Sequence, residues 1–362
     1  MNMLATELSV RNYRSFDGLE LSFAPGTTVL VGRNAVGKTN LVEAVQLLTA
    51  GQSFRRPSPS DLVREGASSC RLELKIEGEG RLLDMGLEAS EGKRTFFRNG
   101  KKVAAAGVRG ELPSVLFCPD HLDMVKRSAS VRRAALDDFG VQLSAQYAKL
   151  ASAYDRTVAQ RNSLLKEYPV PEGILGVWDE ALASAGAALS MHRAALLERI
   201  RSHFTEVYAR IAPHERADVA YRPSIGELGS SREETEALML TALAEARTDE
   251  LRRGLTLVGP HRDEVSFSID GRAARDFGSQ GQQRSLVLAW KIAEVEVTRD
   301  ILGTSPILLL DDVMSELDAA RREAIMAFIE GGIQTVITTT NLGYFSDAVL
   351  DAAKVVRVDD GE

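Results

Sequence analysis

The sequence predicts an α/β fold in which an N-terminal antiparallel β subdomain leads into a parallel sheet, with an α-helical lobe inserted in the chain. Two observations support this prediction. Short apolar runs, alternating or β-branched, occupy both ends of the 362-residue chain, whereas its middle is poor in glycine and proline. The sheet-containing part is expected at 1–120 and 250–362, and the helical lobe at 121–249.

The composition is that of an ordinary globular protein. Hydrophobic residues make up 44% of the chain and charged residues 26%, which excludes disorder as the main state. Two cysteines are too few for a disulfide scaffold. The N-terminus lacks the apolar core of a signal peptide, and no apolar run approaches the ~18 residues of a membrane span. We therefore expect a soluble, cytoplasmic protein without a membrane partner.

The first hundred residues have the pattern of an antiparallel sheet. Residues 4–11 alternate loosely and residues 19–23 alternate cleanly, so the two runs are expected to pair as a hairpin. Two or three further strands are expected within 70–100. There Asn99-Gly100 is a strong signal for a hairpin turn.

The middle of the chain is predicted to be helical, and strands return near residue 255. Helical stretches are expected at about 128–168, 175–211 and 233–247, the first broken by Pro169 and Pro171. The later elements are expected to be strands at 255–259 and 264–269, a helix from Gly281, a strand at 306–312, a helix after Asp318 and a strand at 334–340.

A glycine-bearing turn at 32–39 joins a β-branched run, TTVLV, to an amphipathic run, NLVEAVQLL. Its sequence fits the pattern G-x-x-x-x-G-K-[ST] in the required strand–loop–helix context. Backbone N–H groups and the helix N-terminus are expected to hold phosphates there. Lys38 would reach the β and γ phosphates, and Thr39 would ligate Mg²⁺. The candidate ATP-binding residues are Gly32, Arg33, Asn34, Ala35, Val36, Gly37, Lys38, Thr39 and Asn40.

The apolar strand that begins at Ile307 ends in Asp311 and Asp312. Ligands in open α/β sheets lie at the carboxyl ends of the strands. Asp311 would hold Mg²⁺ through water, and Asp312 would orient or deprotonate the attacking water. Two solvated aspartates at a strand end would be an ordinary feature by themselves. Together with the turn, they and Lys38 are the candidate catalytic residues.

Ser279-Gln280-Gly281-Gln282 opens the next predicted helix. Ser279 with Gln282 has the spacing of a capping box, and a serine hydroxyl and glycine N–H at a helix N-terminus also form an anion site. If the turn at 32–39 already holds the chain's own phosphates, this second site would take the γ-phosphate bound by a second copy. Both interpretations can hold, and Ser279, Gly281 and Gln282 are further candidate ATP contacts.

The order of these motifs resembles the ATP-binding-cassette (ABC) ATPases, with SELD at 315–318 after the acidic strand. The start of the chain is similar to the head domains of the chromosome-maintenance and repair branch. Only 267 residues separate Thr39 from Ile307, so no long coiled-coil arm fits between them. The chain resembles the armless RecF family over nearly its whole length. The matching pieces are NYRSF, GRNAVGKTN, GQSFR, VLFCPDHLDMVK, GPHRDE, GSQGQQRSLVLAWK and LLLDDVMSELD.

The resemblance implies an ABC-ATPase head with a weak, DNA-stimulated ATPase that uses ATP and Mg²⁺ and dimerises on ATP. It implies binding to DNA at single-strand gaps and duplex junctions, and work with RecO and RecR to place RecA on gapped DNA. Roles in replication restart and the SOS response are implied as well. By position, Lys38, Thr39 and Asp311 match the family's nucleotide-binding and Mg²⁺-binding residues. Ser279 and Gly281 match the signature motif that acts in trans. Asp318 matches a residue whose loop crosses the dimer interface.

Two features depart from the wider ABC pattern. Asp312 stands where glutamate is usual, and the threonines at 338–340 stand where a switch histidine is expected. Both departures are consistent with slow ATP hydrolysis, in which bound ATP holds the dimer together. Neither identifies the residue that acts as the general base.

Charge is distributed unevenly. The net charge is −7, yet the window from Lys93 to Arg133 holds ten basic and three acidic residues. This segment is either a footprint for the phosphate backbone of DNA or a solvated surface with counter-charges elsewhere. The candidate DNA contacts are Lys126, Arg127, Arg132 and Arg133, and for Arg132 and Arg133 the alternative is salt bridges between domains.

The sequence leaves two possible roles for each of Arg14 and His261, and it allows a second class of function. Arg14 either approaches the nucleotide or is an ordinary exposed arginine, and His261 either lies near a ligand or caps a turn. The alternative function is a nucleotide-driven ATPase without a DNA role that acts on a protein or membrane partner. ATPase rates with and without DNA distinguish the two classes.

Overall fold

The computed structural model describes residues 3–167 and 172–359, and the chain divides into two compact units. The first unit comprises Met1–Leu122 and Val287–Glu362 and is called the sheet unit below. The second comprises Asp123–Leu286 and is called the insert unit.

The insert unit ends later in the chain than residue 249, where the sequence analysis placed its end. Strand β10 (Glu264–Ile269) pairs antiparallel with β9 (Ala217–Arg222), and β11 (Arg272–Ala273) pairs with β10. Because β10 bonds to β9 and β11 bonds to β10, the segment from residue 250 to Leu286 belongs to the insert unit. Strand β9 was not predicted, because a single strand within a helical segment has no partner nearby in the sequence.

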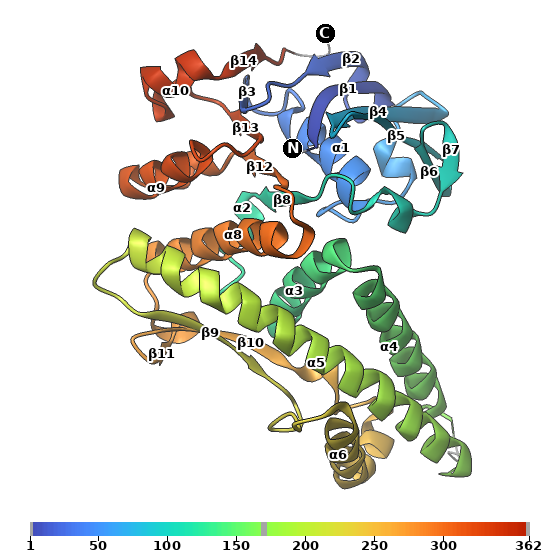
Figure 1. Ribbon diagram of the computed structural model, residues 1–362. Coiled ribbons are helices and arrows are strands. Elements are labelled where there is room, and N and C mark those ends of the chain that lie inside the picture. The colour runs from blue at the N-terminus through green and yellow to red at the C-terminus, as the bar shows by residue number, and fades with distance from the viewer. Residues whose placement is uncertain (1–2, 168–171, 360–362) are drawn as a thin grey trace. The chain divides into compact units, whose positions relative to one another are not determined.

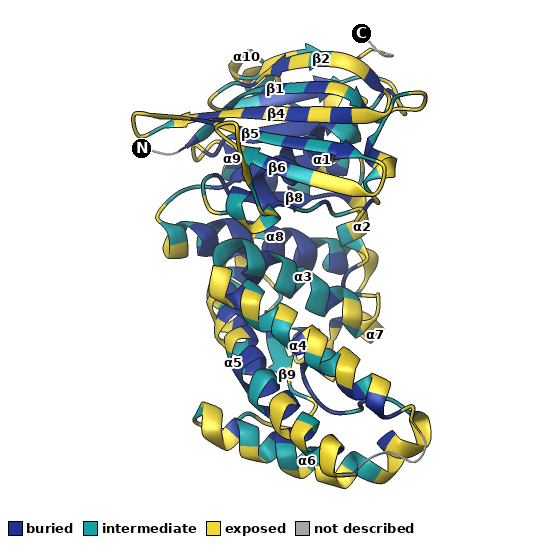
Figure 2. Ribbon diagram, turned by 90° about the vertical axis from the view of Figure 1, so that its right-hand side faces the viewer, coloured by how far each residue is buried: buried dark blue, intermediate teal, exposed yellow. Residues whose placement is uncertain are grey.

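The first sheet of the sheet unit is antiparallel, in the order β2-β1-β4-β5-β6-β7. Along most of β4, side chains alternate between buried and exposed (Figure 2), because one face covers the core and the other faces solvent. The predicted N-terminal hairpin and the turn at Asn99-Gly100, whose φ angles are 49° and 71°, are confirmed. The strands are β1 (Leu4–Tyr13), β2 (Phe16–Ser22), β4 (Ser69–Gly78), β5 (Arg81–Ser90), β6 (Lys93–Arg98) and β7 (Lys101–Val103).

The second sheet of this unit is parallel, in the order β14-β3-β13-β12-β8. Its strands are β3 (Thr27–Val31), β8 (Ser114–Phe117), β12 (Ile307–Asp311), β13 (Thr335–Thr339) and β14 (Lys354–Arg357). Every residue of β12 and β13 is buried, as expected for central parallel strands. The sequence analysis predicted β3, β12 and β13 and missed the outer strands β8 and β14.

Helix α1 (Lys38–Ala50) contacts strands of both sheets (Figure 1). Its predicted apolar face, Leu41, Val45 and Leu48, is at most 1% exposed, and the helix ends at Gly51 with a positive φ of 69°. The unit also contains α2 (Pro119–Leu122), α9 (Ala319–Ile329) and α10 (Asp347–Ala352), and α8 (Gln280–Leu302) runs into it from the insert unit. The core that α1 shares with both sheets holds the turn at 32–39 in place.

Among the described residues of the insert unit, four long helices lie wholly within it, and α5 is the longest of them (Figure 1). The helix predicted at 128–168 is two helices, because the chain breaks at Ser144, whose hydroxyl accepts the N–H of Tyr147 as an N-cap. Pro169 and Pro171 lie outside the described residues. Within those residues no helix, α5 included, is long and apolar enough to cross a membrane. The helices are α3 (Ala129–Leu143), α4 (Ala145–Leu164), α5 (Glu172–Ile211) and α6 (Arg232–Arg253), with the short α7 (Ala274–Phe277).

The strand predicted at 255–259 is wrong. The N–H of Thr256 donates to Asn162 Oδ1 at 2.7 Å, and the N–H of Leu257 donates to Glu250 Oε1 at 2.7 Å. The carbonyl of Thr256 accepts from His261 and Arg262. Side chains thus satisfy the backbone groups that a strand would pair with a neighbour.

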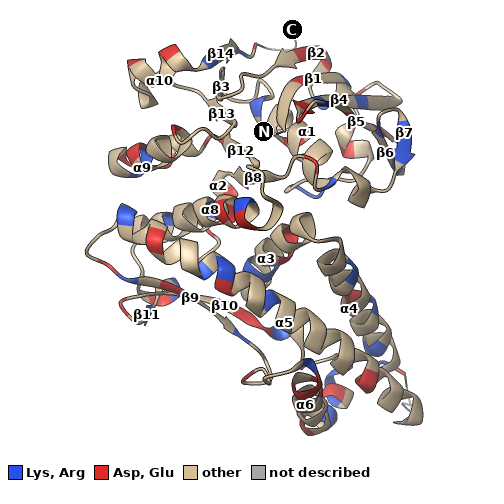
Figure 3. Cartoon of the chain, in the orientation of Figure 1, with Lys and Arg blue, Asp and Glu red and all other residues tan. Residues whose placement is uncertain are grey.

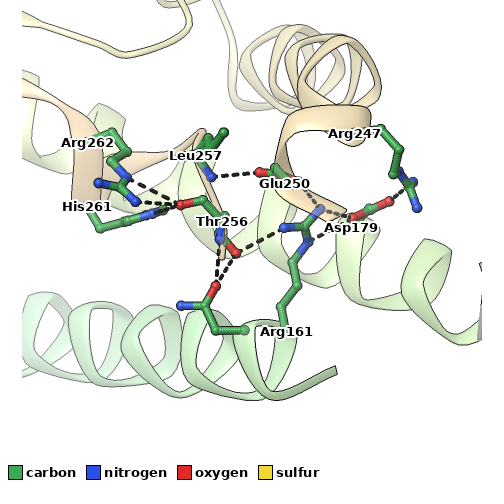
Figure 4. Close-up of polar contacts among 9 residues, drawn as sticks. Arg161, Asp179, Arg247, Glu250, Thr256, Leu257, His261 and Arg262 are labelled. Carbon is green, nitrogen blue, oxygen red and sulfur yellow. Dashed lines mark hydrogen bonds and ion pairs between the residues drawn. The ribbon is translucent and has the colours of Figure 1, made fainter. Parts of the chain in front are cut away.

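A fully buried arginine joins three parts of the insert unit (Figure 4). Arg161 of α4 donates from Nε to Asp179 Oδ1 of α5 at 2.8 Å and from Nη2 to Glu250 Oε2 of α6 at 2.6 Å. Its Nη1 reaches the hydroxyl of Thr256 at 3.0 Å. Arg247 makes a second ion pair with Asp179, so the two carboxylates face two guanidinium groups. The cluster is therefore neutral and hydrogen-bonded, the condition for burying charge without a large penalty.

Replacement of Arg161 by methionine is expected to destabilise the insert unit by about 3–5 kcal/mol, because the change leaves Glu250 buried without its counter-charge. Denaturant unfolding and the hydrogen exchange of α4 and α6 measure the effect. The matched control is Arg252→Met on α6, whose ion pair with Asp249 is exposed and should cost less than about 1 kcal/mol. Equal losses in the two variants would contradict the interpretation of the cluster.

Candidate nucleotide-binding site

The turn at 32–39 wraps around the side chain of Lys38. The lysine Nζ donates to the carbonyl of Gly32 at 2.9 Å and to that of Arg33 at 2.8 Å, and the residue is 6% exposed. Burial lowers the pKa of Lys38, and the charges of Asp312 and Asp311 oppose this shift. The ammonium group is therefore held at the centre of the turn by weak neutral acceptors, which an anion could replace.

Two glycines are required by the space around the turn. Gly37 has a φ of +101°, and a Cβ there would lie 2.6 Å from the ring of Phe16 and 2.8 Å from the Ser15 hydroxyl. At Gly32 a Cβ would lie 2.3 Å from the carbonyl oxygen of Val358. Any other residue at either position would displace the backbone of the turn.

Strand β12 delivers Asp311 to the same place. Its Oδ1 accepts from the hydroxyl of Thr39 at 2.9 Å and from that of Thr338 on β13 at 2.8 Å. Burial raises the pKa of Asp311, although both hydroxyl groups and the charges of Arg55 and Lys38 favour the ionised form. A carboxylate beside a threonine hydroxyl is a set of oxygen ligands that suits Mg²⁺.

Asp312 follows directly and is held in an unusual backbone conformation. Its φ is 53°, and its N–H donates to the Thr338 hydroxyl at 2.9 Å. Burial raises the pKa of Asp312, Lys38 opposes this effect, and Asp311 adds to it. Among the described residues, Asp312 Oδ1 is one of two buried side-chain atoms without a hydrogen-bond partner. A buried acceptor of this kind needs a ligand or water to satisfy it.

These groups surround a cavity of about 380 Å³, called the loop cavity below. The structure therefore brings the predicted turn and the acidic strand end together. Val36 instead packs in the hydrophobic core, and Gly32 and Arg33 contribute through the carbonyls that hold Lys38. The lining residues are Asn34, Ala35, Gly37, Lys38, Thr39, Asn40, Arg55 and Asp312.

The sequence analysis missed Arg55 as a site residue. Its Nη1 donates to Asn40 Oδ1 at 3.0 Å, and it is 3.5 Å from Glu43 Oε2. Glu43 is fully buried and also accepts from Arg14 and Ser53. Arg14 is therefore a partner of Glu43, and not an ordinary exposed arginine. Arg55 lies in the piece GQSFR, but no fixed spacing marks a loop arginine as a cavity residue.

Ser279, Gly281 and Gln282 belong to the insert unit, at the start of α8. The predicted capping box is confirmed: Ser279 Oγ accepts the N–H of Gln282 at 3.2 Å, and Gln282 Oε1 accepts the N–H of Ser279 at 2.8 Å. Gln282 Nε2 also donates to Glu215 at 2.9 Å, and Ser279 is exposed. Asp318 similarly caps α9 by accepting the N–H of Arg321 at 3.0 Å.

The structure corrects one candidate DNA contact. Arg132 is 4% exposed and pairs with Glu264 at 2.7 Å, while its Nη1 donates to three backbone carbonyls. Arg133 is half-buried and donates to the Asp263 carbonyl. Both arginines hold the insert unit together internally, because each has a partner more than a hundred residues away in the sequence. Lys126 and Arg127 are exposed.

The remaining basic residues of the window lie mostly on the hairpin of β6 and β7, in the sheet unit. Lys93, Arg94, Lys101 and Lys102 are exposed there, and Figure 3 shows the lysines of β7 at the edge of the sheet. The basic residues of the window thus belong to both units.

His261 has a structural role. Its Nδ1 accepts from Tyr154 Oη at 2.7 Å, and its Nε2 donates to the carbonyl of Thr256 at 3.0 Å. Burial lowers the pKa of His261 to about 4, so the ring is neutral near pH 7. It stabilises the turn after Gly259, as the turn-capping alternative predicted.

The chain is similar to known proteins over nearly its whole length. The family described as "RecF/RecN/SMC N terminal domain" matches residues 4–362. The DNA replication and repair protein RecF of Symbiobacterium thermophilum is 40% identical over 348 residues, covering 94% of this chain and 92% of the relative. That of Synechococcus sp. (strain JA-3-3Ab) is 36% identical over 364 residues, covering 98% and 96%.

Solved structures show the same likeness. A structure of the recombination mediator protein RecF-ATP in the RecFOR pathway is similar with a TM-score of 0.91 and 30% identity, over 100% of this chain and 97% of that one. A Smc head domain from Pyrococcus furiosus has a TM-score of 0.57 at 16% identity, over 99% and 94%, and shares the fold alone. With the two sheets described above, these likenesses confirm the predicted ABC-ATPase head fold.

Proposed function

The chain belongs to the RecF family of DNA replication and repair proteins, and on this basis we propose that it is an ATP-dependent, DNA-binding recombination mediator. It dimerises on ATP, binds DNA at single-strand gaps and junctions, and with RecO and RecR assists the loading of RecA. The proposal includes roles in gap repair, replication restart and the SOS response. The observation that carries it is the loop cavity, which Lys38, Thr39 and Asp312 line and behind which Asp311 is hydrogen-bonded to Thr39.

The residues present fit ATP and Mg²⁺. Lys38 donates to two neutral carbonyls, which a phosphate would replace, and Asp312 Oδ1 is a buried acceptor that has no hydrogen-bond partner among the described residues. Thr39 and Asp311 would hold Mg²⁺, which supplies charge stabilisation to the phosphates when bound. Glycine at 32 and 37 lets the backbone N–H groups approach the phosphates.

Asp312 would orient or deprotonate the attacking water. It is one methylene shorter than the glutamate usual in ABC ATPases, and Thr338 occupies the place near the usual switch histidine. Thr338 bonds to both aspartates and thereby positions the pair, but a hydroxyl cannot take up a proton as an imidazole can. These substitutions support a weak ATPase, in which ATP acts chiefly as a clamp between two copies.

Ser279, Gly281 and Gln282 would bind the γ-phosphate held by the second copy. Ser279→Arg should therefore abolish the ATP-dependent dimer and hydrolysis and leave ATP binding by the monomer nearly intact. Sedimentation with ATP and binding of a fluorescent nucleotide measure the two properties separately.

The matched control is Ser231→Arg, since Ser231 caps α6 in the same way and lies in the same unit. Both variants lose a helix cap worth about 1 kcal/mol, so only the dimer should distinguish them. A Ser279→Arg protein that dimerises on ATP with wild-type affinity would mean that Ser279 is only a cap.

DNA binding is proposed to use the exposed basic residues, Lys101 and Lys102 on β7 and Lys126 and Arg127 before α3. Reversing either pair to glutamate should weaken binding for all sequences alike. It should also lower the slope of log affinity against log salt by about 1 for each residue that contacts a phosphate. Fluorescence anisotropy at several salt concentrations measures both effects. Two variants with the wild-type salt slope would contradict this placement.

The alternative, an ATPase that acts on a protein or membrane partner without DNA, predicts a hydrolysis rate indifferent to DNA. A rate that rises with gapped DNA at low salt supports the recombination mediator.

A further inference from the structure

Phe277 is an exposed aromatic residue close to the helix start that would face a second copy. It is 62% exposed, and among the exposed large apolar side chains of the described ranges it is the sole aromatic one. The guanidinium of Arg272 lies over its ring at 4.3 Å from the centroid. Single exposed apolar residues are common on protein surfaces. Phe277 differs from them in the turn that holds it and in its distance from Ser279.

The segment that presents Phe277 is rigidly held. The buried side chain of Gln283 donates to the carbonyl of Ala274 at 3.1 Å and to that of Gly278 at 2.9 Å. The N–H of Gly278 also donates to the Ala274 carbonyl at 3.0 Å, and a Cβ at Gly278 would lie 2.6 Å from that oxygen. The turn between α7 and α8 is thus tight and is held by these three hydrogen bonds. Phe277 is exposed because this turn holds it there, and not because the segment lacks contacts.

Phe277 lies close to Ser279 because the two residues are only two positions apart in the sequence. Two residues span at most about 7 Å, so the backbone of Phe277 lies within that distance of Ser279. A surface that brings Ser279 to a partner's nucleotide must also bring Phe277 to that partner. Aromatic residues and arginine are enriched at the buried centres of protein interfaces.

We propose that Phe277, with Arg272 stacked on it, is an anchor of the ATP-dependent dimer that packs on the sheet unit of a second copy, beside the loop cavity. This inference rests on the proposed function and adds an apolar contact to the phosphate contact of Ser279. Arg272 keeps the ring oriented, because the cation–π contact restricts its rotation before the second copy binds. DNA bases also stack on aromatic residues, and a result showing that Phe277 contacts DNA instead of a second copy would overturn the proposal.

The test uses the full chain with the slowly hydrolysed analogue ATPγS. Phe277→Ala should leave nucleotide binding by the monomer unchanged and raise the dimer dissociation constant at least about tenfold, which corresponds to ~1.4 kcal/mol. Phe277→Trp should restore most of the affinity. The control is Val177→Ala on α5 of the same unit, which removes an equally exposed apolar side chain (64%) and should change nothing.

A photocrosslinker provides a second measurement that does not depend on the truncated variant. With p-benzoylphenylalanine in place of Phe277, irradiation should link two copies only when ATPγS is present, and mass spectrometry should place the link in the sheet unit of the second copy. Combining this residue with Lys38→Met should remove the link.

The outcomes separate this inference from the proposed function. If Ser279→Arg is monomeric while Phe277→Ala dimerises normally, only the anchor is wrong. If Ser279→Arg dimerises normally, the proposed dimer itself is wrong. A Phe277→Ala protein that dimerises normally but binds DNA more weakly would assign the ring to DNA.

Discussion

Lys38→Met is expected to abolish ATP binding and dimerisation together. The lysine provides charge-assisted hydrogen bonds to phosphate, each worth about 1.5–3 kcal/mol, so losing two should weaken ATP binding at least ~100-fold. In the structure the ammonium group is already placed at the centre of the turn by the carbonyls of Gly32 and Arg33. Methionine has similar length but offers no charge.

Titration with a fluorescent ATP analogue measures the affinity, and sedimentation measures the dimer. Lys149→Met, which removes an exposed lysine from α4, is the control and should bind ATP as the wild type does. Substantial ATP-dependent dimer in the Lys38 variant would contradict the assignment of the turn. Circular dichroism verifies that the Lys38 variant is folded.

Asp312→Asn is expected to slow hydrolysis by about 10²–10⁴-fold, the usual contribution of a general base, while ATP and Mg²⁺ still bind. The amide has the shape of the carboxylate, and the bond from the Asp312 N–H to Thr338 involves only the backbone. The fold of the strand end should therefore survive the change. Because the ATP-bound dimer dissociates after hydrolysis in the proposed cycle, its lifetime should increase.

Single-turnover hydrolysis and the decay of the dimer after dilution measure the two effects. Asp347→Asn replaces an exposed aspartate of the same unit, at the start of α10, and should hydrolyse ATP at the wild-type rate. Unchanged hydrolysis in Asp312→Asn would show that another group activates the water.

Local patterns in the sequence determined the parts of the fold whose contacts are close along the chain. Alternating apolar residues predicted the first hairpin, and Asn99-Gly100 predicted the turn between β6 and β7, because both depend on the backbone preferences of residues adjacent in sequence. The turn at 32–39 was predicted for the same reason. Ala35 and Gly37 take the positive φ angles of this turn, 69° and 101°, and the apolar run before it is a buried strand.

The failures have one feature in common, which is that a distant partner decides the outcome. Residues 255–259 have the composition of a strand, but Asn162, 94 residues away in the sequence, accepts the N–H of Thr256 that a neighbouring strand would otherwise bind. Strand β9 forms only because β10 pairs with it across more than forty residues. A window of sequence contains no information on such partners.

The sequence by itself thus determined the glycine-bearing turn at 32–39, the acidic strand end and the capping box at Ser279, since each is a short motif with its own backbone geometry. Only the tertiary structure decided which charged residues are free to bind a ligand. Arg132 and Lys126 are both basic residues of the same charged segment. Arg132 is buried, where it bonds to Glu264 and three backbone carbonyls, whereas Lys126 is exposed to solvent. A charge is buried only where the fold supplies its counter-charge and hydrogen bonds, and the counter-charge of Arg132 comes from Glu264, 132 residues away in the sequence.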